Sequence, residues 1–173
     1  MTYITVPLNA DHDRSAFSCG TAAIDNFLKT QASQHMKKSH ASVIFVLADE
    51  KNKVQAFYSL SNDSIPYSEI PEAIKKIVPR YKNLGVILIG QLAVDKASQN
   101  NRLGTHILMD ALARCYDAAS TVTGAVAVVV DPIDVRAAEW YKKFGFIQLP
   151  DQTRLFLPMK TIDDLFSPKS NNV

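Results

Sequence analysis

Two short segments contain the residue types from which an anion-binding or catalytic site could be built. The first begins with the apolar residues Leu92, Ala93 and Val94, continues through the polar stretch Asp95–Arg102, and ends where a helix is expected to start. The first N–H groups of a helix have no partner inside the helix, so such a junction can bind a phosphate. An ordinary connection between a strand and a helix has the same composition, and this segment alone leaves both interpretations open.

The second segment is a predicted helix over residues 134–144. Asp134 is a natural N-cap, and Tyr141 lies two turns further along the same face, where its phenol could donate a proton. The alternative is that Tyr141 and its aromatic neighbours only pack the helix onto a sheet. Taken alone, this segment favours packing.

The remaining reactive side chains indicate neither a metal site nor a nucleophile. The four histidines have no cysteine or carboxylate at a ligand spacing, so we predict no metal site. Cys19 and Cys115 are expected to be reduced thiols, because there is no CxxC pair and a disulfide scaffold needs more cysteines. Cys115 falls on an apolar helical stripe and is predicted to lie in the core.

Hydrophobic periodicity predicts the elements that would position these segments. Apolar and β-branched runs predict strands over 3–6, 42–48, 54–61, 86–94, 125–130 and 154–159, with Gly90 marking a bulge. Helical spacing predicts one helix capped by Thr21 and others over 71–78, 103–119 and 134–144, the last ended by Gly145. The polar turn 49–52 indicates a hairpin, and 86–130 has the order strand, helix, strand. The predicted fold class is therefore α/β, with a twisted mixed β-sheet and helices on both faces.

Length and composition describe one folded protein. The chain has 173 residues, of which 47% are hydrophobic and 21% charged, so it can bury a core without a metal or disulfides. We predict a single domain over residues 1–166 and a flexible C-terminal tail over 167–173. No signal peptide is apparent, and no apolar run reaches the ~20 residues of a membrane span, so a cytoplasmic protein with no membrane partner is expected.

Two basic stretches are candidates for contacts to nucleic acid, although a formal net charge of +2 does not require such a partner. Residues 31–42 include Lys37 and Lys38 and no acidic residue, and Arg80 belongs to a second basic cluster. These side chains could contact RNA phosphates. Solvated surface is the alternative, and it is the usual meaning of a run of charges.

Taken together, the two chemical segments resemble the GCN5-related N-acetyltransferase (GNAT) superfamily. Its Gln/Arg-x-x-Gly-x-Gly/Ala loop resembles Gln99–Gly104, and its Asn/Asp-x-x-Ala-x-x-x-Tyr-x-x-x-Gly-Phe helix resembles 134–146. The sequence is most similar to the GNAT toxins of toxin–antitoxin pairs. Their hallmarks resemble, in order, residues 17–20, 24–28, 58–61, 79–81, 90–95, 129–131 and 155–159.

The resemblance implies that acetyl is transferred from acetyl-CoA to the α-amino group of an aminoacyl-tRNA, which blocks translation. Tyr141 would protonate or position the departing thiolate, and a backbone N–H near Val94 would polarise the thioester carbonyl. Lys37, Lys38 and Arg80 would contact the RNA. A ribbon-helix-helix antitoxin is an expected partner, and a homodimer is compatible with the resemblance. The residues implied in acetyl-CoA binding are Leu92, Ala93, Val94, Gln99, Asn100, Asn101, Arg102, Leu103, Gly104, Thr105, Asp134 and Ala137.

The sequence departs from the family pattern at three positions. Asn100 and Arg102 replace loop glycines, which allow close backbone approach and positive φ, and Gln91 replaces an arginine common in the toxins. Two other functions therefore stay open. One is a GNAT that acts on a small amine or a protein, and the other is a GNAT-fold binding module with impaired use of acetyl-CoA.

Overall fold

The computed structural model of the protein describes residues 2–167. The chain forms two compact units: unit 1 comprises residues 1–61 and 89–111, and unit 2 comprises residues 62–88 and 112–173. The single domain over 1–166 stays a prediction. Residues 168–173 of the predicted tail lie outside the described residues.

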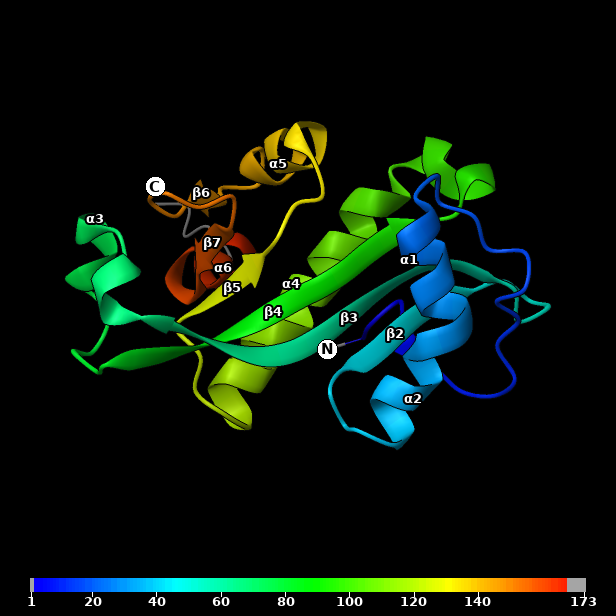
Figure 1. Ribbon diagram of the computed structural model, residues 1–173, viewed down its shortest axis with the longest axis horizontal. Coiled ribbons are helices and arrows are strands. Elements are labelled where there is room, and N and C mark those ends of the chain that lie inside the picture. The colour runs from blue at the N-terminus through cyan, green and yellow to red at the C-terminus, as the bar shows by residue number, and fades with distance from the viewer. Residues whose placement is uncertain (1, 168–173) are drawn as a thin grey trace, which may run out of the picture. The chain divides into compact units, whose positions relative to one another are not determined.

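Within the described residues, seven strands form one sheet in the order β1-β2-β3-β4-β5-β7-β6 (Figure 1). The two longest strands, β3 and β4, run through both units. The predicted α/β fold class with a mixed sheet is confirmed. The strands are β1 (Val6–Pro7), β2 (Val43–Ala48), β3 (Val54–Pro66), β4 (Asn83–Val94), β5 (Ala127–Val130), β6 (Ile147–Gln148) and β7 (Leu155–Pro158).

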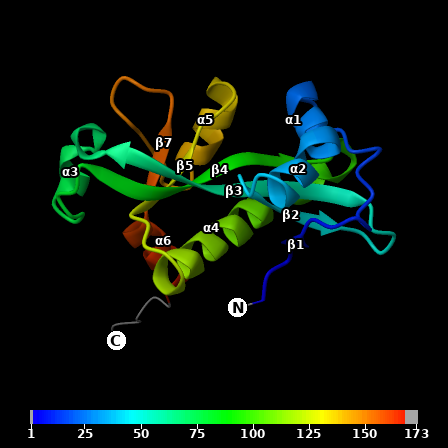
Figure 2. The same ribbon diagram turned by 60° about the horizontal axis from the view of Figure 1, so that its bottom comes forward.

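Unit 1 carries helices on both faces of its strands (Figure 2). One face is covered by α1 (Ala22–Asn26), the π-helix η1 (Phe27–Gln31) and α2 (Ala32–Lys37), and the other by the first half of α4 (Leu103–Thr121). The buried side chains of Phe27 and Leu28 belong to one apolar cluster with residues of the antiparallel β2–β3 hairpin. This core fixes the strand from which the predicted phosphate loop leaves.

Two carbonyl groups in and next to the π-helix η1 accept hydrogen bonds from side chains. Arg14 Nη1 donates to the carbonyl of Leu28 at 2.9 Å, and Thr30 Oγ1 donates to the carbonyl of Asn26 at 2.8 Å. The predicted helix after Thr21 is thus present but interrupted. Thr21 stands at its N-cap without the expected side-chain hydrogen bond.

Unit 2 is built around the antiparallel pair β5 and β7, whose eight residues are all buried. Helix α5 (Val135–Lys142) covers one face of these strands, while α6 (Met159–Phe166) and the second half of α4 cover the other (Figure 2). Gly145 follows α5 with a φ of +98°, a left-handed conformation that side chains disfavour. The helix ends at Lys142, two residues before the predicted end at 144, and Gly145 terminates the turn that follows it.

Several predicted boundaries are corrected by the structure. The first strand covers Val6–Pro7 instead of 3–6, and β3 continues to Pro66. The helix predicted over 71–78 is reduced to α3 (Glu72–Lys75), and the 3₁₀ helix η2 (Tyr67–Glu69), which was not predicted, precedes it. The stretch 95–102, predicted as a loop, contains the 3₁₀ helix η3 (Lys96–Asn101). The last predicted strand ends at Pro158 because α6 starts at Met159.

Candidate functional site

The junction between β4 and α4 is held in shape by Asp95. Its Oδ2 accepts the N–H of Ala97 at 3.1 Å and so caps η3, while Oδ1 accepts the N–H of Ser18 at 2.9 Å. The N–H of Lys96 donates to the carbonyl of Ser18 at 2.8 Å. The loop is therefore tied to the chain before α1. Asp95 and Ser18 were not predicted as site residues, although an aspartate directly after a strand and before a helical turn is a capping signal.

Gln99 also links the loop to the chain before α1. Its Nε2 donates to the carbonyl of Cys19 at 3.1 Å and to the carbonyl of Val94 at 3.0 Å. The side-chain amide is therefore engaged within the protein. Gln99 shapes the loop through its side chain, which leaves the main chain and Arg102 as the groups that could meet an anion.

Arg102 occupies the left-handed region, with φ 53° and ψ 22°, at the residue directly before α4. This is where the sequence was expected to need glycine, so the backbone conformation is kept although the glycine is not. The side chain is exposed. Next to it, the first N–H groups of α4, from Leu103 to Thr105, have no partner inside the helix. A guanidinium and a helix N-terminus thus lie side by side, and both favour an anion.

The N–H groups at the end of β4 alternate in direction. The N–H groups of Gln91 and Asp95 point to β3, where they meet Ser59 Oγ at 2.9 Å and the carbonyl of Gln55 at 2.8 Å. Because successive N–H groups of a strand alternate in direction, those of Leu92 and Val94 point away from β3. Ala93, between them, is buried in the core of unit 1. The N–H of Val94 is therefore directed away from β3, and its contact with a carbonyl stays a prediction.

Gly90 lies where the side chain of Ser59 comes close to β4. A Cβ atom at Gly90 would lie 3.0 Å from Ser59 Oγ. The N–H of the next residue bonds to this hydroxyl instead of to a carbonyl of the neighbouring strand. The predicted bulge stays a prediction, and the close approach of Ser59 explains the glycine.

Tyr141 is buried in unit 2, on α5. Its side chain packs edge-on against Phe146, with ring centroids 5.4 Å apart, and against Trp140 at 5.0 Å. Burial raises the pKa of the phenol, so the hydroxyl keeps its proton at neutral pH. This hydroxyl makes no hydrogen bond to another residue among 2–167. Among the described residues, it is a protonated donor without a hydrogen-bond acceptor. Proton donation to a substrate and simple packing of the helix onto the sheet both remain compatible with this position.

The start of α5 is anchored by two aspartates. Asp134 Oδ1 accepts the N–H of Ala137 at 2.7 Å, so the predicted N-cap is confirmed. Three residues earlier, Asp131 is held by Arg154 through two hydrogen bonds of 2.8 Å, and the same guanidinium donates to Asp63 of β3 at 2.8 Å. The Arg154 contacts were missed, because pairing between residues so distant in sequence leaves no local pattern.

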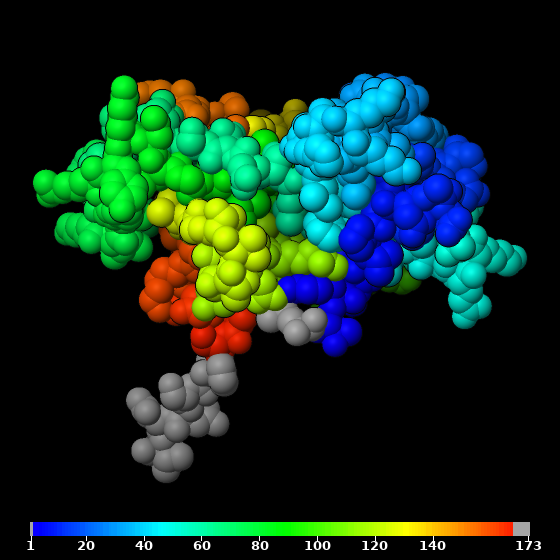
Figure 3. Space-filling model, turned by 90° about the horizontal axis from the view of Figure 1, so that it is seen from below, coloured from blue at the N-terminus to red at the C-terminus, as the bar shows by residue number. Residues whose placement is uncertain are grey.

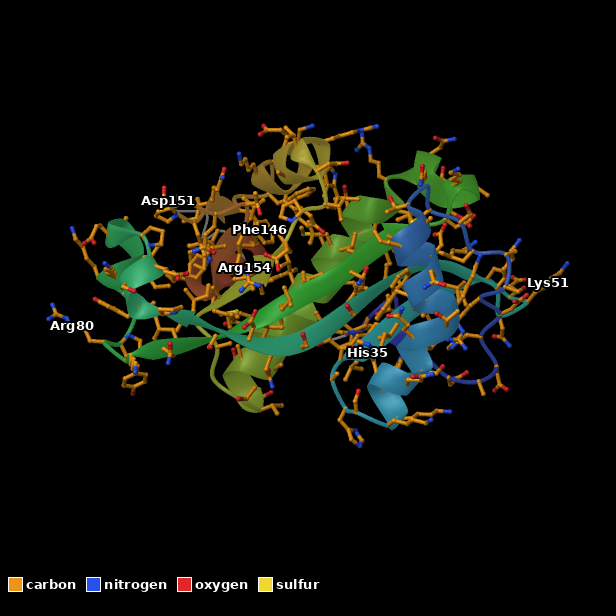
Figure 4. The ribbon with its side chains drawn as sticks, in the orientation of Figure 1. His35, Lys51, Arg80, Phe146, Asp151 and Arg154 are labelled. Carbon is orange, nitrogen blue, oxygen red and sulfur yellow. The ribbon has the colours of Figure 1, made fainter. Side chains whose placement is uncertain are left out.

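The predicted RNA contacts lie on exposed surface in both units. Lys37 and Lys38 are exposed at the end of α2 in unit 1, and Arg80 is exposed in unit 2, where it points away from the strands (Figure 4). None of the three forms an ion pair within residues 2–167. Residues 92–94 and 99–105, which are expected to bind acetyl-CoA, lie in unit 1. Asp134, Ala137 and Tyr141 lie in unit 2.

Cys19 and Cys115 are both free thiols, as predicted. Burial raises the pKa of Cys19 to about 11, so this thiol is a poor nucleophile at neutral pH. Within residues 2–167, no three His, Cys, Asp or Glu side chains gather where they could hold a metal ion. None of the described helices has the length and apolar character needed to cross a membrane.

Comparison with known proteins places this geometry in a family. The profile of the Acetyltransferase (GNAT) family matches residues 21–146. A protein of Sinorhizobium fredii named probable toxin TacT is 30% identical over 171 residues, which cover 94% of each chain. A Mycobacterium tuberculosis protein named tRNA-acetylating toxin is 31% identical over 149 residues, covering 86% of this chain and 87% of that one.

Solved structures agree with the sequence comparison. AtaT complexed with acetyl-methionyl-tRNAfMet has a TM-score of 0.84 and 27% identity, covering 94% of this chain and 98% of that one. A mutant AtaT toxin bound to the C-terminus of the antitoxin AtaR has a TM-score of 0.77 and 26% identity, covering 95% and 98%. From the family profile, the two relatives and the fold, this chain belongs to the GNAT family of acetyltransferases.

Proposed function

We propose that this protein transfers acetyl from acetyl-CoA to the α-amino group of an aminoacyl-tRNA and thereby acts as a toxin of a toxin–antitoxin pair. The observation that carries the proposal is the similarity, over nearly the whole chain, to proteins whose names describe tRNA acetylation. The reaction would take place in the cytoplasm, where aminoacyl-tRNA is made and used.

The loop before α4 fits the pyrophosphate of acetyl-CoA. The first N–H groups of α4 and the exposed guanidinium of Arg102 favour a negatively charged group. The nearby carboxylate of Asp95 is hydrogen-bonded to two main-chain N–H groups, which reduces its repulsion toward a phosphate. Asn100 and Asn101 add no charge of the wrong sign. The family resemblance also assigns Asp134 and Ala137 to acetyl-CoA binding.

Acetyl-CoA supplies an acetyl group activated as a thioester, and the protein directs its transfer. In the attack, the neutral α-amino nitrogen forms a bond to the carbonyl carbon, and negative charge develops on the oxygen. The N–H of Val94, which points away from β3, would stabilise that charge. When the carbon–sulfur bond breaks, the thiolate takes the proton that Tyr141 holds, the amine releases its own proton to water, and Tyr141 regains a proton from water.

The acceptor and the partner follow from the same proposal. Lys37, Lys38 and Arg80 carry unpaired positive charge, which suits RNA phosphates. A toxin of this kind requires a neutralising protein, and we propose a ribbon-helix-helix antitoxin encoded next to it. A small-amine acceptor would leave these cations without a role.

The test compares acceptors and two tyrosine variants. The protein is expected to acetylate charged tRNA much faster than free amines. Tyr141→Phe should reduce turnover ~10²–10⁴-fold with acetyl-CoA affinity and stability nearly unchanged, because only an unpartnered hydroxyl is removed. Tyr58→Phe is the matched control, since the Tyr58 hydroxyl donates to the buried Asp110 at 2.7 Å. It should cost about 1–3 kcal/mol of stability and leave turnover of the folded protein unchanged.

Two results would reject the proposal. Equal rates on free amines and charged tRNA would favour the small-amine acetyltransferase. A melting temperature that does not move in millimolar acetyl-CoA would favour the binding module, because a ligand that binds only the folded state must stabilise it. A Tyr141→Phe variant as active as the parent would remove Tyr141 from the chemistry.

A further inference from the structure

The segment 76–82 of unit 2, between α3 and β4, exposes positive charge without a counter-charge. Lys76, Arg80 and Lys82 are exposed, and the segment contains no acidic residue. None of the three is in an ion pair within the described part of the chain. Lys75, directly before the segment, differs from them, because it pairs with Glu72 at 2.7 Å. The free charge therefore begins at residue 76.

The same segment exposes apolar side chains among the cations. Tyr81 is 67% exposed and Ile77 61%, whereas Val78 between them packs against the core of unit 2. The segment, coloured green, stands out at the margin of the molecular surface in Figure 3, and Arg80 points outward in Figure 4. An aromatic ring left in solvent between two cations is the combination by which proteins bind single-stranded nucleic acid.

Both ends of the segment are fixed to the body of unit 2. The N–H of Ile77 donates to the carbonyl of Ile74 at 3.0 Å, and the carbonyl of Lys82 accepts the N–H of Tyr67 at 3.0 Å. Pro79 restricts the backbone directly before Arg80. Tyr81 is therefore presented by a short loop with fixed ends, which reduces the ordering cost of binding.

We propose that Tyr81 stacks on an unpaired base of the RNA substrate while Arg80 and Lys82 contact the adjoining phosphates. This inference rests on the proposed function and adds to it the part of the RNA that the segment recognises. The three unpaired cations select a polyanion over an apolar protein surface. The exposed ring selects unpaired bases over a duplex, whose bases are already stacked. The single-stranded 3′ end that carries the aminoacyl group has both features.

The test uses two RNA hairpins of the same acceptor stem, one with its single-stranded 3′ end and one blunt. Tyr81→Leu keeps an apolar side chain but removes the aromatic face, and Tyr81→Phe keeps that face. Tyr81→Leu is expected to weaken binding of the single-stranded form roughly 5- to 150-fold and of the blunt form little. Tyr81→Phe should bind like the parent. Val122→Ala, at an 82% exposed residue of the same unit, is the control that should change neither.

Three results would overturn the inference. Tyr81→Leu binding both hairpins like the parent would show an unused ring, and equal weakening on both would exclude the unpaired base. A change of sedimenting mass in Tyr81→Leu, with RNA affinity kept, would mean that the ring contacts a second copy of the chain. Acetylation of intact charged tRNA by the parent is measured alongside. An active parent with an indifferent Tyr81 refutes only this inference, whereas an inactive parent refutes the proposed function.

Discussion

The left-handed backbone of Arg102 makes Arg102→Gly a test of both folding and acetyl-CoA binding. A left-handed conformation costs an ordinary side chain ~1–2 kcal/mol, and glycine avoids that cost. Glycine also gains freedom in the unfolded chain, which offsets ~0.4–1 kcal/mol of the benefit. The variant should therefore be as stable as the parent or up to about 1.6 kcal/mol more stable, which is a rise in melting temperature of about 3–6 °C at most for a chain of this size.

The effect on acetyl-CoA binding has the opposite sign. If the guanidinium contacts the pyrophosphate, its removal loses one charge-assisted hydrogen bond at an exposed position, or about tenfold in affinity. Arg102→Ala separates the two effects, because it removes the charge and keeps the unfavourable conformation. Calorimetric titration at two salt concentrations should give the same tenfold loss and the same weaker salt dependence for both variants. Only Arg102→Gly should gain stability.

Tighter acetyl-CoA binding in both variants would refute this reasoning and show that the arginine obstructs the loop. A loss of acetyl-CoA affinity in Arg102→Ala but not in Arg102→Gly would also refute this reasoning. The backbone conformation, rather than the charge, would then control binding.

Two other predictions concern RNA binding and thiol chemistry. The combined change of Lys37, Lys38 and Arg80 to alanine should weaken charged-tRNA binding and leave acetyl-CoA affinity unchanged. The slope of log K against log salt concentration should fall by about 0.7–0.9 per lost phosphate contact. An unchanged kcat/KM on charged tRNA at physiological salt would contradict the RNA role. Burial raises the pKa of Cys19 to about 11, so its alkylation by iodoacetamide should be slow at pH 7.5 and rise about tenfold per pH unit toward that value. A half-maximal rate near pH 8.5, or a rate equal to that of the unfolded chain, would show an accessible thiol instead.

The sequence predicted those parts of the fold that depend on neighbouring residues. The hairpin turn, the apolar stripe of α4, the cap at Asp134 and the left-handed Gly145 are all local features, and the structure confirms each. The predictions were less accurate where distant residues decide. The strand predicted over 3–6 is displaced, because Ile4 and Thr5 bond instead to the side chain of Asp110 on α4.

For the candidate site, too, local features could be predicted and contacts between distant residues could not. The positions of Tyr141 and of the residues at the start of α4 followed from spacing. The hydrogen bonds that hold them could not be predicted, because Asp95 reaches Ser18 and Arg154 reaches Asp131 and Asp63 across long stretches of sequence. Their partners are set by the folded sheet, and no local pattern indicates them.

These distant contacts also join two motifs that are far apart in the sequence. Ser18 and Cys19 precede α1, whereas Asp95 and Gln99 follow β4, and hydrogen bonds join the two stretches into one structure. Gly20 lies against this junction with a φ of +101°, and a Cβ atom there would be 3.4 Å from Lys96 Cε. A change in either stretch would shift the carbonyls to which Gln99 bonds and, through the loop, the backbone of Arg102. The first stretch therefore shapes the loop through hydrogen bonds, and Gly20 is required there by its left-handed backbone and not by a lack of space.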